Sequence, residues 1–416
     1  MHRVVITGVG CLSPLGHSAP EHMAASRAGK TGVALSTAID PEKLQCKYVA
    51  EVKNFDPADH LDKKVVSMVD RFAALALVAS NEAIADSGLS FDEELSEQTA
   101  VVLGSGVGGI TTVDDNFLRL YGEGAKRLHP FVIPKLMANA ASSQITMMHG
   151  IKGPAWSVAS ACSSANHAIS NAFTMVRSGQ TRVAITGGTE SCITLGTMKG
   201  WEALRVMAPE MCQPFSVDRK GMIIGEGSGI FVLERLDDAV ARGAKIYAEV
   251  AGTGMTSDAG DLVQPSMEGA ARAIKIAMRD AGLNPEDIGY INAHGTATPA
   301  NDPTETAAIK HVLGDRAYKV PVSSTKAMHG HALGAAGALE LVCCLSALDG
   351  VVPPTINFSE PDPSCDLDYV PNEARDAPVD ALLSNSFAFG GLNAVLALRR
   401  FCLLYTSDAA DDLVGV

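Results

Sequence analysis

One cysteine lies in a segment whose pattern suits covalent acyl chemistry. Residues 157–165 have the sequence Ser-Val-Ala-Ser-Ala-Cys-Ser-Ser-Ala, which places Cys162 between a short apolar run and a series of small residues. This pattern predicts a strand, a bend that carries Cys162, and a helix. A thiol at a helix N-terminus lies near the positive end of the helix dipole and near free backbone N–H groups, which lower its pKa. Cys162 is therefore a candidate nucleophile, although a buried structural cysteine is the commoner role for any single cysteine.

Two histidines follow predicted strands in the second half of the chain. His294 leaves a hydrophobic strand and enters a turn of Gly, Thr and Pro, and His331 ends a segment that also contains Lys326. A helix of small residues that carries Glu340 comes next. A single histidine at a strand end is more often structural than catalytic. Two of them, together with a cysteine at a bend, favour a shared catalytic site.

A fourth segment, residues 385–393, supplies a glycine turn at the end of a predicted strand. Gly390 and Gly391 follow Phe389, and backbone N–H groups in such a turn are free to point at an oxyanion. The same turn also meets a structural need, because glycine adopts positive φ angles without strain. Both interpretations hold at once.

The elements that must position these residues occur twice in the same order, as a diverged internal repeat. Each copy has a strand that ends in a glycine turn, a helix closed by glycine, a buried strand and loop, and a strand–elbow–helix followed by a strand into a double-glycine turn. In the second helix Ile274, Ala277, Met278 and Ala281 recur at helical spacing and predict one buried face. The matched segments are 6–10 with 250–254, 86–89 with 280–283, 100–106 with 290–296, and Cys162 and Gly187-Gly188 with Lys326 and Gly390-Gly391.

Strands that alternate with helices predict an α/β fold with mostly parallel strands covered by helices. The repeat divides the chain into residues 1–245 and 246–401, and its pseudo-symmetry brings Cys162 from one half to His294 and His331 of the other. Residues 107–156 have no counterpart in the second half and are interpreted as an insertion that serves assembly or substrate access. Residues 402–416 add no motif and are interpreted as a non-native, disordered tail.

The composition excludes several classes of protein. A formal net charge of −14 argues against a nucleic-acid partner, because phosphates need a basic surface. Nine cysteines without a CxxC pair indicate reduced thiols and a cytoplasmic location. The most apolar stretch, 333–348, contains Glu340 and is too short for a membrane span, and the first apolar run is too short for a signal peptide.

With these motifs the sequence resembles the elongating-type β-ketoacyl-[acyl carrier protein] synthases, whose fold is the thiolase fold. The resemblance extends from Arg3 to about Phe401 and rests on residues 161–164, 292–296, 324–331 and 385–387. It implies two pseudo-symmetric βα halves in αβαβα layers. It also implies a decarboxylative Claisen condensation, in which an acyl chain on Cys162 reacts with malonyl-acyl carrier protein to give β-ketoacyl-acyl carrier protein and CO₂. The pathway would be fatty acid or type II polyketide/polyene synthesis.

The same resemblance implies roles for individual residues. Cys162, His294 and His331 would form the catalytic triad, Lys326 and Glu340 would support His331, and Phe389 would be the gating aromatic whose N–H completes an oxyanion hole. Thr296 and Thr298 would hold the pantetheine arm of the carrier. The remaining implied sites are substrate contacts at Phe387, Trp201, Val107 and Phe131 and carrier docking at Lys63, Lys64, Arg127 and Arg205.

The family resemblance further implies a dimer, formed with an identical or a related subunit, to whose interface the 107–156 insertion contributes. No cofactor or metal is expected, because the carrier supplies the phosphopantetheine arm. Three residues depart from the family pattern: Leu392 replaces Thr, His or Gln, Trp201 replaces a smaller pocket residue, and Val132 replaces an aromatic. These departures argue against a standard long saturated chain and favour specialised relatives such as polyene, aryl polyene or nodulation-type synthases.

Four other functions fit the sequence less well. Residues 104–109 fit G-x-G-x-x-G, but no suitably placed acidic residue supports a dinucleotide site. His329 and His331 form an H-x-H pair without a clear third ligand, which is a poor zinc signature. A thiolase would use a second active-site cysteine and no paired histidines. The alternative function is that of a non-catalytic chain-length-factor-like subunit, which shares the fold but lacks the nucleophile.

Overall fold

A computed structural model describes residues 1–401, so the predicted tail at 402–416 lies outside the described residues. Ten strands form one continuous sheet in the order β10-β9-β13-β14-β8-β1-β7-β6-β4-β5. The first five in the chain are β1 (Val4–Leu12), β4 (Thr99–Gly104), β5 (Ala155–Val158), β6 (Val183–Glu190) and β7 (Gly227–Arg235). The second five are β8 (Ala248–Ser257), β9 (Tyr290–Asn292), β10 (Val322–Ser323), β13 (Ala381–Ala388) and β14 (Leu392–Arg399).

The sheet has an internal two-fold pattern that confirms the predicted pair of pseudo-symmetric halves. From one edge, β5, β4 and β6 are parallel, and β7 and β1 continue antiparallel. From the other edge, β10, β9 and β13 are parallel, and β14 and β8 continue antiparallel. The halves join where β1 pairs antiparallel with β8, Val5 lying opposite Glu249. The predicted elements of the repeat therefore occupy equivalent places.

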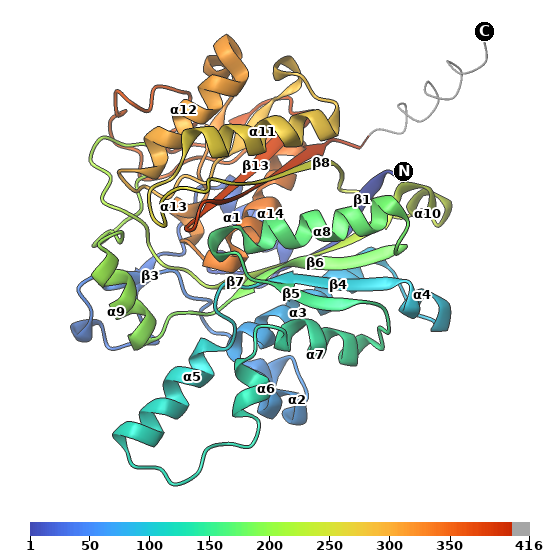
Figure 1. Ribbon diagram of the computed structural model, residues 1–416, viewed down its shortest axis with the longest axis vertical. Coiled ribbons are helices and arrows are strands. Elements are labelled where there is room, and N and C mark those ends of the chain that lie inside the picture. Colours follow the sequence, from blue (N-terminus) through green and yellow to red (C-terminus); the bar gives the residue numbers. More distant parts are fainter. Residues whose placement is uncertain (402–416) are drawn as a thin grey trace.

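Five layers follow from this arrangement and appear from top to bottom in Figure 1. Helix α11 covers the outer face of the second half, and α3 and α7 cover the outer face of the first half. Between the two halves lie α8 and α14, which contact each other and strands of both halves. These bounds are α3 (Arg71–Ser87), α7 (Ala140–His149), α8 (Ser164–Ser178), α11 (Met267–Ala281) and α14 (Ala336–Leu348). The chain thus has the predicted αβαβα arrangement of the thiolase fold.

The two outer helices confirm the predicted glycine stops. Helix α3 ends at Gly88 with φ 68°, and α11 ends at Gly282 with φ 60°, both in the left-handed conformation that glycine adopts readily. The predicted buried face of α11 is also confirmed, because Ile274, Ala277 and Met278 are at most 5% exposed.

The glycines inside β1 and β8 have a different role from the predicted turns. Strand β1 continues through Gly8 and Gly10, and β8 continues through Gly252 and Gly254. A Cβ at Gly10 would lie 1.9 Å from the Ala79 backbone oxygen on α3, and a Cβ at Gly254 would lie 2.1 Å from the Ala273 backbone oxygen on α11. Glycine is therefore required by close helix–strand packing in both halves, and the prediction of turns was wrong here.

The double glycine of the first half is likewise not a turn. Gly187 and Gly188 lie inside β6, which runs on to Glu190. A Cβ at Gly187 would lie 2.0 Å from the Gly229 backbone oxygen on β7. Only the second copy, Gly390-Gly391, forms the predicted turn, with φ angles of 83° and 68°.

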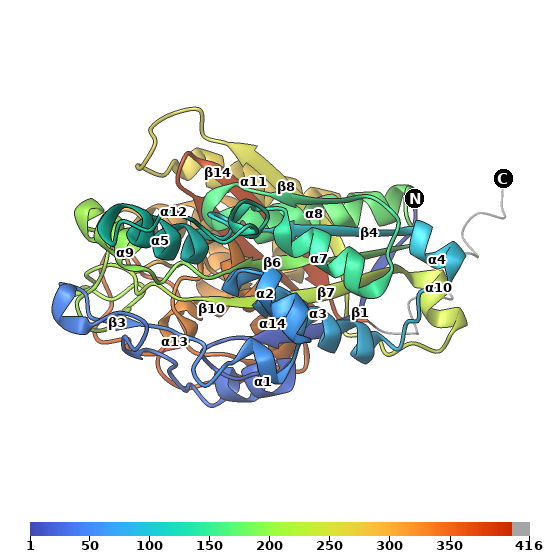
Figure 2. The ribbon, with the colours of Figure 1, turned by 90° about the horizontal axis from the view of Figure 1, so that it is seen from below.

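The first part of the 107–156 segment projects from the body, whereas its helix α7 packs on the first half, and none of these helices has a counterpart in the second half (Figure 1). It contains α5 (Ile110–Phe117), the π-helical turn η3 (Leu118–Gly122), α6 (Val132–Leu136) and α7. Seen from below, α2 (Lys63–Met68), α3 and α7 lie across the strands of the first half (Figure 2).

The remaining described elements lie around this core, and none of the helices in residues 1–401 is long and apolar enough to cross a membrane. Two further two-stranded sheets pair β2 (Ala34–Leu35) with β3 (Tyr48–Val49) and β11 (Val351–Val352) with β12 (Arg375–Asp376). The other helices are α1 (Ala19–Arg27), α4 (Glu93–Glu97), α9 (Leu195–Leu204), α10 (Leu236–Ala241), α12 (Asn301–Leu313) and α13 (Lys326–His329), with 3-10 turns η1 (Pro41–Lys43), η2 (Pro57–Asp59), η4 (Ala161–Ser163), η5 (Pro285–Asp287), η6 (Gly314–Lys319) and η7 (Leu333–Ala335).

Candidate active site

Cys162 lies at the bend between β5 and α8, as the sequence pattern predicts. The bend is the short turn η4, which starts at Ala161 with a positive φ of 50°. A positive φ is uncommon for a residue with a side chain, so this elbow is a strained point held by its surroundings. The Cys162 side chain is 6% exposed and lines a pocket.

The acidity of the Cys162 thiol differs from the sequence-based expectation. Burial raises the pKa of Cys162 to about 12, and this outweighs the lowering by the Lys326 charge and by the Phe389 N–H. Glu190 and Glu340 raise the pKa further. The favourable position at the helix N-terminus does not compensate for removing the thiolate from water, so the resting group is a thiol.

The two predicted histidines meet Cys162 in this pocket. His331 Nε2 lies 3.0 Å from Cys162 Sγ, and the His294 and His331 rings are T-shaped with centroids 5.6 Å apart. Burial is the largest cause that holds the pKa of each histidine well below its ordinary value, and the Lys326 charge adds to it. Both imidazoles are therefore neutral near pH 7, and each offers one N–H donor.

Lys326 supports His294 and not His331, which corrects the expected pairing. Its Nζ donates to the His294 backbone oxygen at 2.6 Å, lies 3.4 Å from His294 Nδ1, and forms a buried ion pair with Glu340. The reason is the chain path, because Gly330 with φ 70° turns the backbone after α13 and directs His331 toward Cys162. An ammonium beside Nδ1 makes that nitrogen the acceptor, so the His294 proton lies on Nε2.

Phe389, the residue expected to supply an oxyanion donor, lies in the glycine turn between β13 and β14. The Phe389 backbone N–H faces the Cys162 sulfur. The turn is tied to a neighbouring loop, because the Gly390 N–H donates to the Leu262 backbone oxygen at 2.8 Å and Asn393 Nδ2 donates to Asp258 at 2.7 Å. The N–H groups of Cys162 and Phe389 can thus stabilise negative charge on a thioester oxygen at Cys162.

The pocket that contains these groups has a volume of about 280 Å³. Its wall is mostly apolar and includes the predicted substrate contacts Trp201 and Phe387. Thr296 and Thr298 also line it, with their hydroxyl oxygens 3.0 Å apart. An apolar wall with a few convergent polar groups is typical of a small-molecule site.

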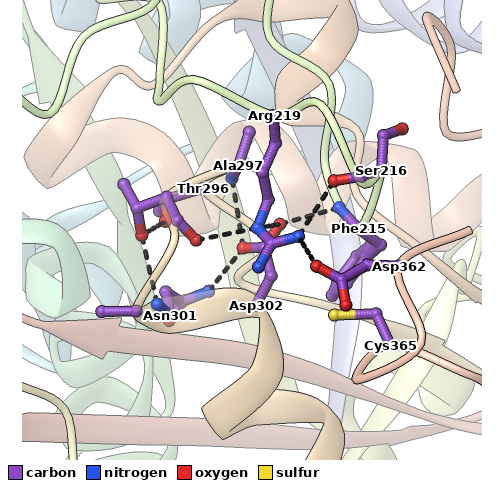
Figure 3. A network of polar contacts seen from close by, with 12 residues as sticks. Phe215, Ser216, Arg219, Thr296, Ala297, Asn301, Asp302, Asp362 and Cys365 are labelled. Carbon is purple, nitrogen blue, oxygen red and sulfur yellow. Dashed lines mark hydrogen bonds and ion pairs between the residues drawn. The ribbon is translucent and has the colours of Figure 1, made fainter. Parts of the chain in front are cut away.

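A buried ionic network holds the turn that carries the two threonines (Figure 3). Asp302 accepts from the Ala297 N–H at 3.1 Å and from the Phe215 N–H at 2.7 Å. Arg219 donates to the Thr298 backbone oxygen at 3.2 Å and pairs with Asp362 at 2.5 Å. Ala297 has a positive φ of 61°, so this turn depends on its partners to keep its shape.

Three buried acidic residues near the site were not predicted. Glu190 accepts from the Gly106 and Gly334 N–H groups, which joins a loop of the first half to the loop after His331. Glu305 accepts from the His294 and Gly295 N–H groups. Burial raises the pKa of Glu190 to about 7 and that of Asp302 to about 6. A carboxylate buried at the end of a strand or in a helix gives no distinctive sequence pattern, so the sequence does not indicate these residues.

Trp201 and Leu392, two of the departures from the expected family pattern, pack in one apolar cluster, and of the two only Trp201 lines the pocket. The Trp201 ring stacks on Phe389, with centroids 6.1 Å apart and planes at 29°. Leu392 packs in the same apolar cluster as Trp201 and Cys162. Trp201 therefore alters the pocket wall itself, whereas Leu392 alters the packing of the apolar cluster beside it.

Other predicted residues do not line this pocket. Val107 and Phe131 are 43% and 42% exposed and are absent from its wall. Lys63 and Lys64 begin α2 and Arg127 lies between η3 and α6, away from the pocket wall. Arg205 alone of the four predicted docking residues is next to it, directly after the lining residue Leu204.

The triad also has the composition of a metal site, since its sulfur and imidazole nitrogens lie within 4.8 Å of one another. Of the H-x-H pair only His331 belongs to this group, because the His329 ring contacts the Gly330 backbone oxygen and the Thr325 hydroxyl instead. The Lys326 ammonium, 3.4 Å from His294 Nδ1, opposes a second cation at this place. The arrangement suits acyl chemistry better than metal binding.

Comparison with known proteins agrees with this geometry. Residues 1–239 match the family model of the beta-ketoacyl synthase N-terminal domain, and residues 247–359 match that of the C-terminal domain. The chain belongs to the β-ketoacyl synthase family. The nodulation protein E of Rhizobium leguminosarum bv. trifolii is 46% identical over 399 residues, covering 96% of this synthase and 99% of the relative. The 3-oxoacyl-[acyl-carrier-protein] synthase 2 of Synechocystis sp. is 43% identical over 408 residues, covering 96% and 98%.

Solved structures match the synthase over the same range. The ishigamide ketosynthase/chain length factor has a TM-score of 0.91 at 36% identity, covering 96% of this chain and 100% of that chain. A type II PKS ketosynthase in complex with its acyl-carrier protein has a TM-score of 0.86 at 29% identity, covering 96% and 100%. The synthase is thus an acyltransferase of the condensing type, which acts in fatty acid or polyketide synthesis.

Proposed function

We propose that this synthase transfers an acyl group to Cys162 and condenses it with a malonyl group carried by an acyl carrier protein. The observation that carries the proposal is the contact of Cys162 Sγ with His331 Nε2 at 3.0 Å, in a pocket that His294 shares. A chain-length-factor-like subunit without a nucleophile is the weaker alternative, because here the nucleophile and both histidines are in place.

Acyl transfer begins with the Cys162 thiol, which must lose its proton as it attacks. His331 Nε2 is the adjacent acceptor, and the sulfur attacks the carbonyl carbon of the incoming thioester. The N–H groups of Cys162 and Phe389 stabilise the tetrahedral oxyanion. Collapse expels the carrier thiolate, which takes up the proton and leaves an acyl-Cys162 thioester.

Decarboxylation of the malonyl thioester needs donors rather than a strong base. The C–C bond to the carboxylate breaks, its electron pair forms an enolate, and CO₂ leaves. The Nε2–H of His294, fixed by Lys326 at Nδ1, donates to the enolate oxygen. Once the Cys162 sulfur is acylated, His331 no longer accepts from a thiol, and its neutral tautomer with the proton on Nε2 supplies the second donor.

Condensation joins the two halves of the reaction. The enolate carbon attacks the acyl-Cys162 carbonyl, and collapse releases the Cys162 thiolate together with the β-ketoacyl thioester. The thiolate then takes one proton from solvent, which is the proton that the overall reaction consumes. The substrate stays on the pantetheine arm beside Thr296 and Thr298. Because loss of CO₂ generates the carbanion, the reaction requires no cofactor beyond the pantetheine arm of the carrier.

Location and assembly belong to the same proposal. The eight cysteines among the described residues are all free, which supports a reducing, cytoplasmic location. The related structures that contain an acyl-carrier protein or a chain length factor support a carrier partner and a paired subunit, identical or related.

Intact-protein mass spectrometry tests the proposal directly. The synthase is incubated with hexanoyl-loaded acyl carrier protein and then with malonyl-loaded carrier. We expect one hexanoyl group on Cys162 after the first step and β-ketooctanoyl carrier after the second. Acylation at another cysteine, or no acylation from any chain in a panel of lengths and unsaturation, would reject the assignment.

A further inference from the structure

The outer rim of the active-site pocket is apolar, in contrast to the predicted basic docking patch. Three lining residues are well exposed: Leu262 at 73%, Leu204 at 49% and Val263 at 41%. We call these three side chains the apolar rim. Within residues 1–401, no lysine or arginine lines the pocket, and the one carboxylate in its wall is Asp258.

The rim is held in a defined position by hydrogen bonds. The Leu262 backbone oxygen accepts from the Gly390 N–H at 2.8 Å. Asp261 accepts from the Val263 and Gln264 N–H groups at 2.7 and 2.9 Å, and Asp258 accepts from the Ser266 N–H at 3.0 Å. The loop thus presents Leu262 outward without being anchored by apolar contacts of that side chain.

The apolar rim lies at the mouth of the pocket that contains the catalytic residues. Cys162, His294 and His331 are at most 6% exposed, and all three open onto this pocket. A thioester on a carrier protein reaches Cys162 through this mouth, so the carrier surface around the arm must rest on Leu204, Leu262 and Val263.

Charge gives an acidic carrier little attraction at this mouth. The chain has a formal net charge of −14, and the ionised Asp261 stands beside Leu262 on the rim. Arg205 is the one predicted docking residue next to the wall. Long-range steering therefore contributes little here.

We propose that the acyl carrier protein docks on this synthase through apolar contact with the rim, and that its association is insensitive to salt. This inference rests on the proposed function, in which the acyl carrier protein delivers the substrate. The partner is a carrier that presents exposed apolar side chains around the attachment point of its arm. Burying an exposed leucine contributes enough to change affinity by about tenfold or more.

The experiment measures acylation of Cys162 with two hexanoyl donors, a hexanoyl-loaded acyl carrier protein of a bacterial fatty acid synthase and hexanoyl-pantetheine. For Leu262→Asp we expect the ratio of kcat/KM for the carrier to that for pantetheine to fall about tenfold. The matched control is Leu35→Asp, whose exposed leucine lies on β2, and its ratio should stay that of the wild type. Between 0.05 and 0.5 M NaCl, the wild-type KM for the carrier should change less than about twofold.

Three outcomes separate the possibilities. A KM for the carrier that rises steeply with salt, with Leu262→Asp no worse than Leu35→Asp, overturns the inference in favour of basic docking. Equal loss with both donors for Leu262→Asp also overturns it, because Leu262 would then shape the pocket. Failure of the wild type to acylate Cys162 with either donor would instead count against the proposed function.

Discussion

At the scale of single residues, the nucleophile and the decarboxylating groups have separable tasks. Cys162→Ala removes the sulfur but leaves His294 and Lys326 in contact. We expect acylation and condensation to be lost, while CO₂ release from malonyl carrier continues. Release of labelled CO₂ and mass spectrometry measure the two activities. Condensation by Cys162→Ala at the wild-type rate would show that another group carries the acyl chain.

Removal of a histidine tests the complementary half of the mechanism. His294→Ala loses the donor that Lys326 orients, so we expect decarboxylation to fall by about 10²-fold or more, the typical cost of one oxyanion donor. Acylation of Cys162 should continue, because His331 remains 3.0 Å from the sulfur. If His294→Ala instead stopped acylation and released CO₂ normally, the assigned roles would be reversed.

The pKa of Cys162 makes a prediction about pH. Burial raises this pKa to about 12, so below that value the thiol stays protonated and the thiolate fraction grows nearly tenfold per pH unit. We expect the rate of iodoacetamide alkylation of Cys162, followed by peptide mass spectrometry, to rise nearly tenfold from pH 7 to 8 and again from 8 to 9. A rate that is already constant at pH 7 would indicate that the helix N-terminus outweighs burial.

The sequence predicts part of this chemistry and misses part of it. Cys162, His294 and His331 belong to recognisable motifs, so the sequence alone predicts that they share one site. The partner of Lys326 was predicted incorrectly, because the direction of a side chain after α13 depends on the Gly330 turn. Glu190 was not predicted at all, because its function comes from burial between two loops distant in sequence.

At the scale of elements, the glycines of the central strands set how closely helices pack. Gly254→Ala would place a methyl group 2.1 Å from the Ala273 backbone oxygen. A backbone atom cannot move aside as a flexible side chain can. We therefore expect the free energy of unfolding to fall by about 2–3 kcal/mol. Urea denaturation followed by circular dichroism measures it.

The matched control for this glycine is in helix α9. Gly200→Ala meets nothing within 4 Å, so the helix preference of alanine should leave stability unchanged or raise it by up to about 1 kcal/mol. Equal stabilities of the two variants would mean that β8 and α11 separate freely, contrary to the close packing described here.

The Arg219 network makes a second prediction at this scale, about the turn that holds the arm. Arg219→Lys keeps a charge but loses the fork that joins Thr298, Ser216 and Asp362. We expect KM for acyl-pantetheine to rise roughly three- to tenfold while kcat changes little, because Arg219 does not touch the reacting atoms. A purely structural role would lower the melting temperature and kcat together, with KM unchanged.

The element pattern was largely predictable because the internal repeat constrains each half. Glycine stops at Gly88 and Gly282 and the buried face of α11 follow from local spacing. The errors concern glycines inside strands, such as Gly10 and Gly187, where the requirement comes from a helix or strand far away in the sequence. Local pattern cannot distinguish that need from a turn.

At the scale of the whole molecule, the duplicated fold places one active site where the halves meet. The elbow after β5 supplies Cys162, and the equivalent segment after β10 supplies Lys326 and His331. The two copies have therefore diverged into a nucleophile half and a donor half. The projecting 107–156 segment belongs to one half alone, so symmetry within the chain does not explain it.

The 107–156 segment exposes several large apolar side chains to solvent. Leu118 and Tyr121 on η3 are 64% and 78% exposed, and Ile133 on α6 is 59% exposed. Exposed apolar patches of this kind mark interfaces, so we expect the synthase to pair through α5, η3 and α6. Light scattering at micromolar concentration should give twice the chain mass of 43.3 kDa.

Substitution of this patch decides whether it makes the interface. In Tyr121→Asp combined with Ile133→Asp, charges replace exposed apolar side chains that the expected interface would bury, and we expect the measured mass to fall to that of one chain. Leu35→Asp, on the exposed strand β2, is the control and should stay paired. A wild-type monomer that gains mass when a related chain-length-factor-like subunit is co-expressed would identify a heterodimer on the same surface. A wild-type dimer that the double variant leaves intact would place the interface elsewhere and return the projecting helices to a role in substrate access.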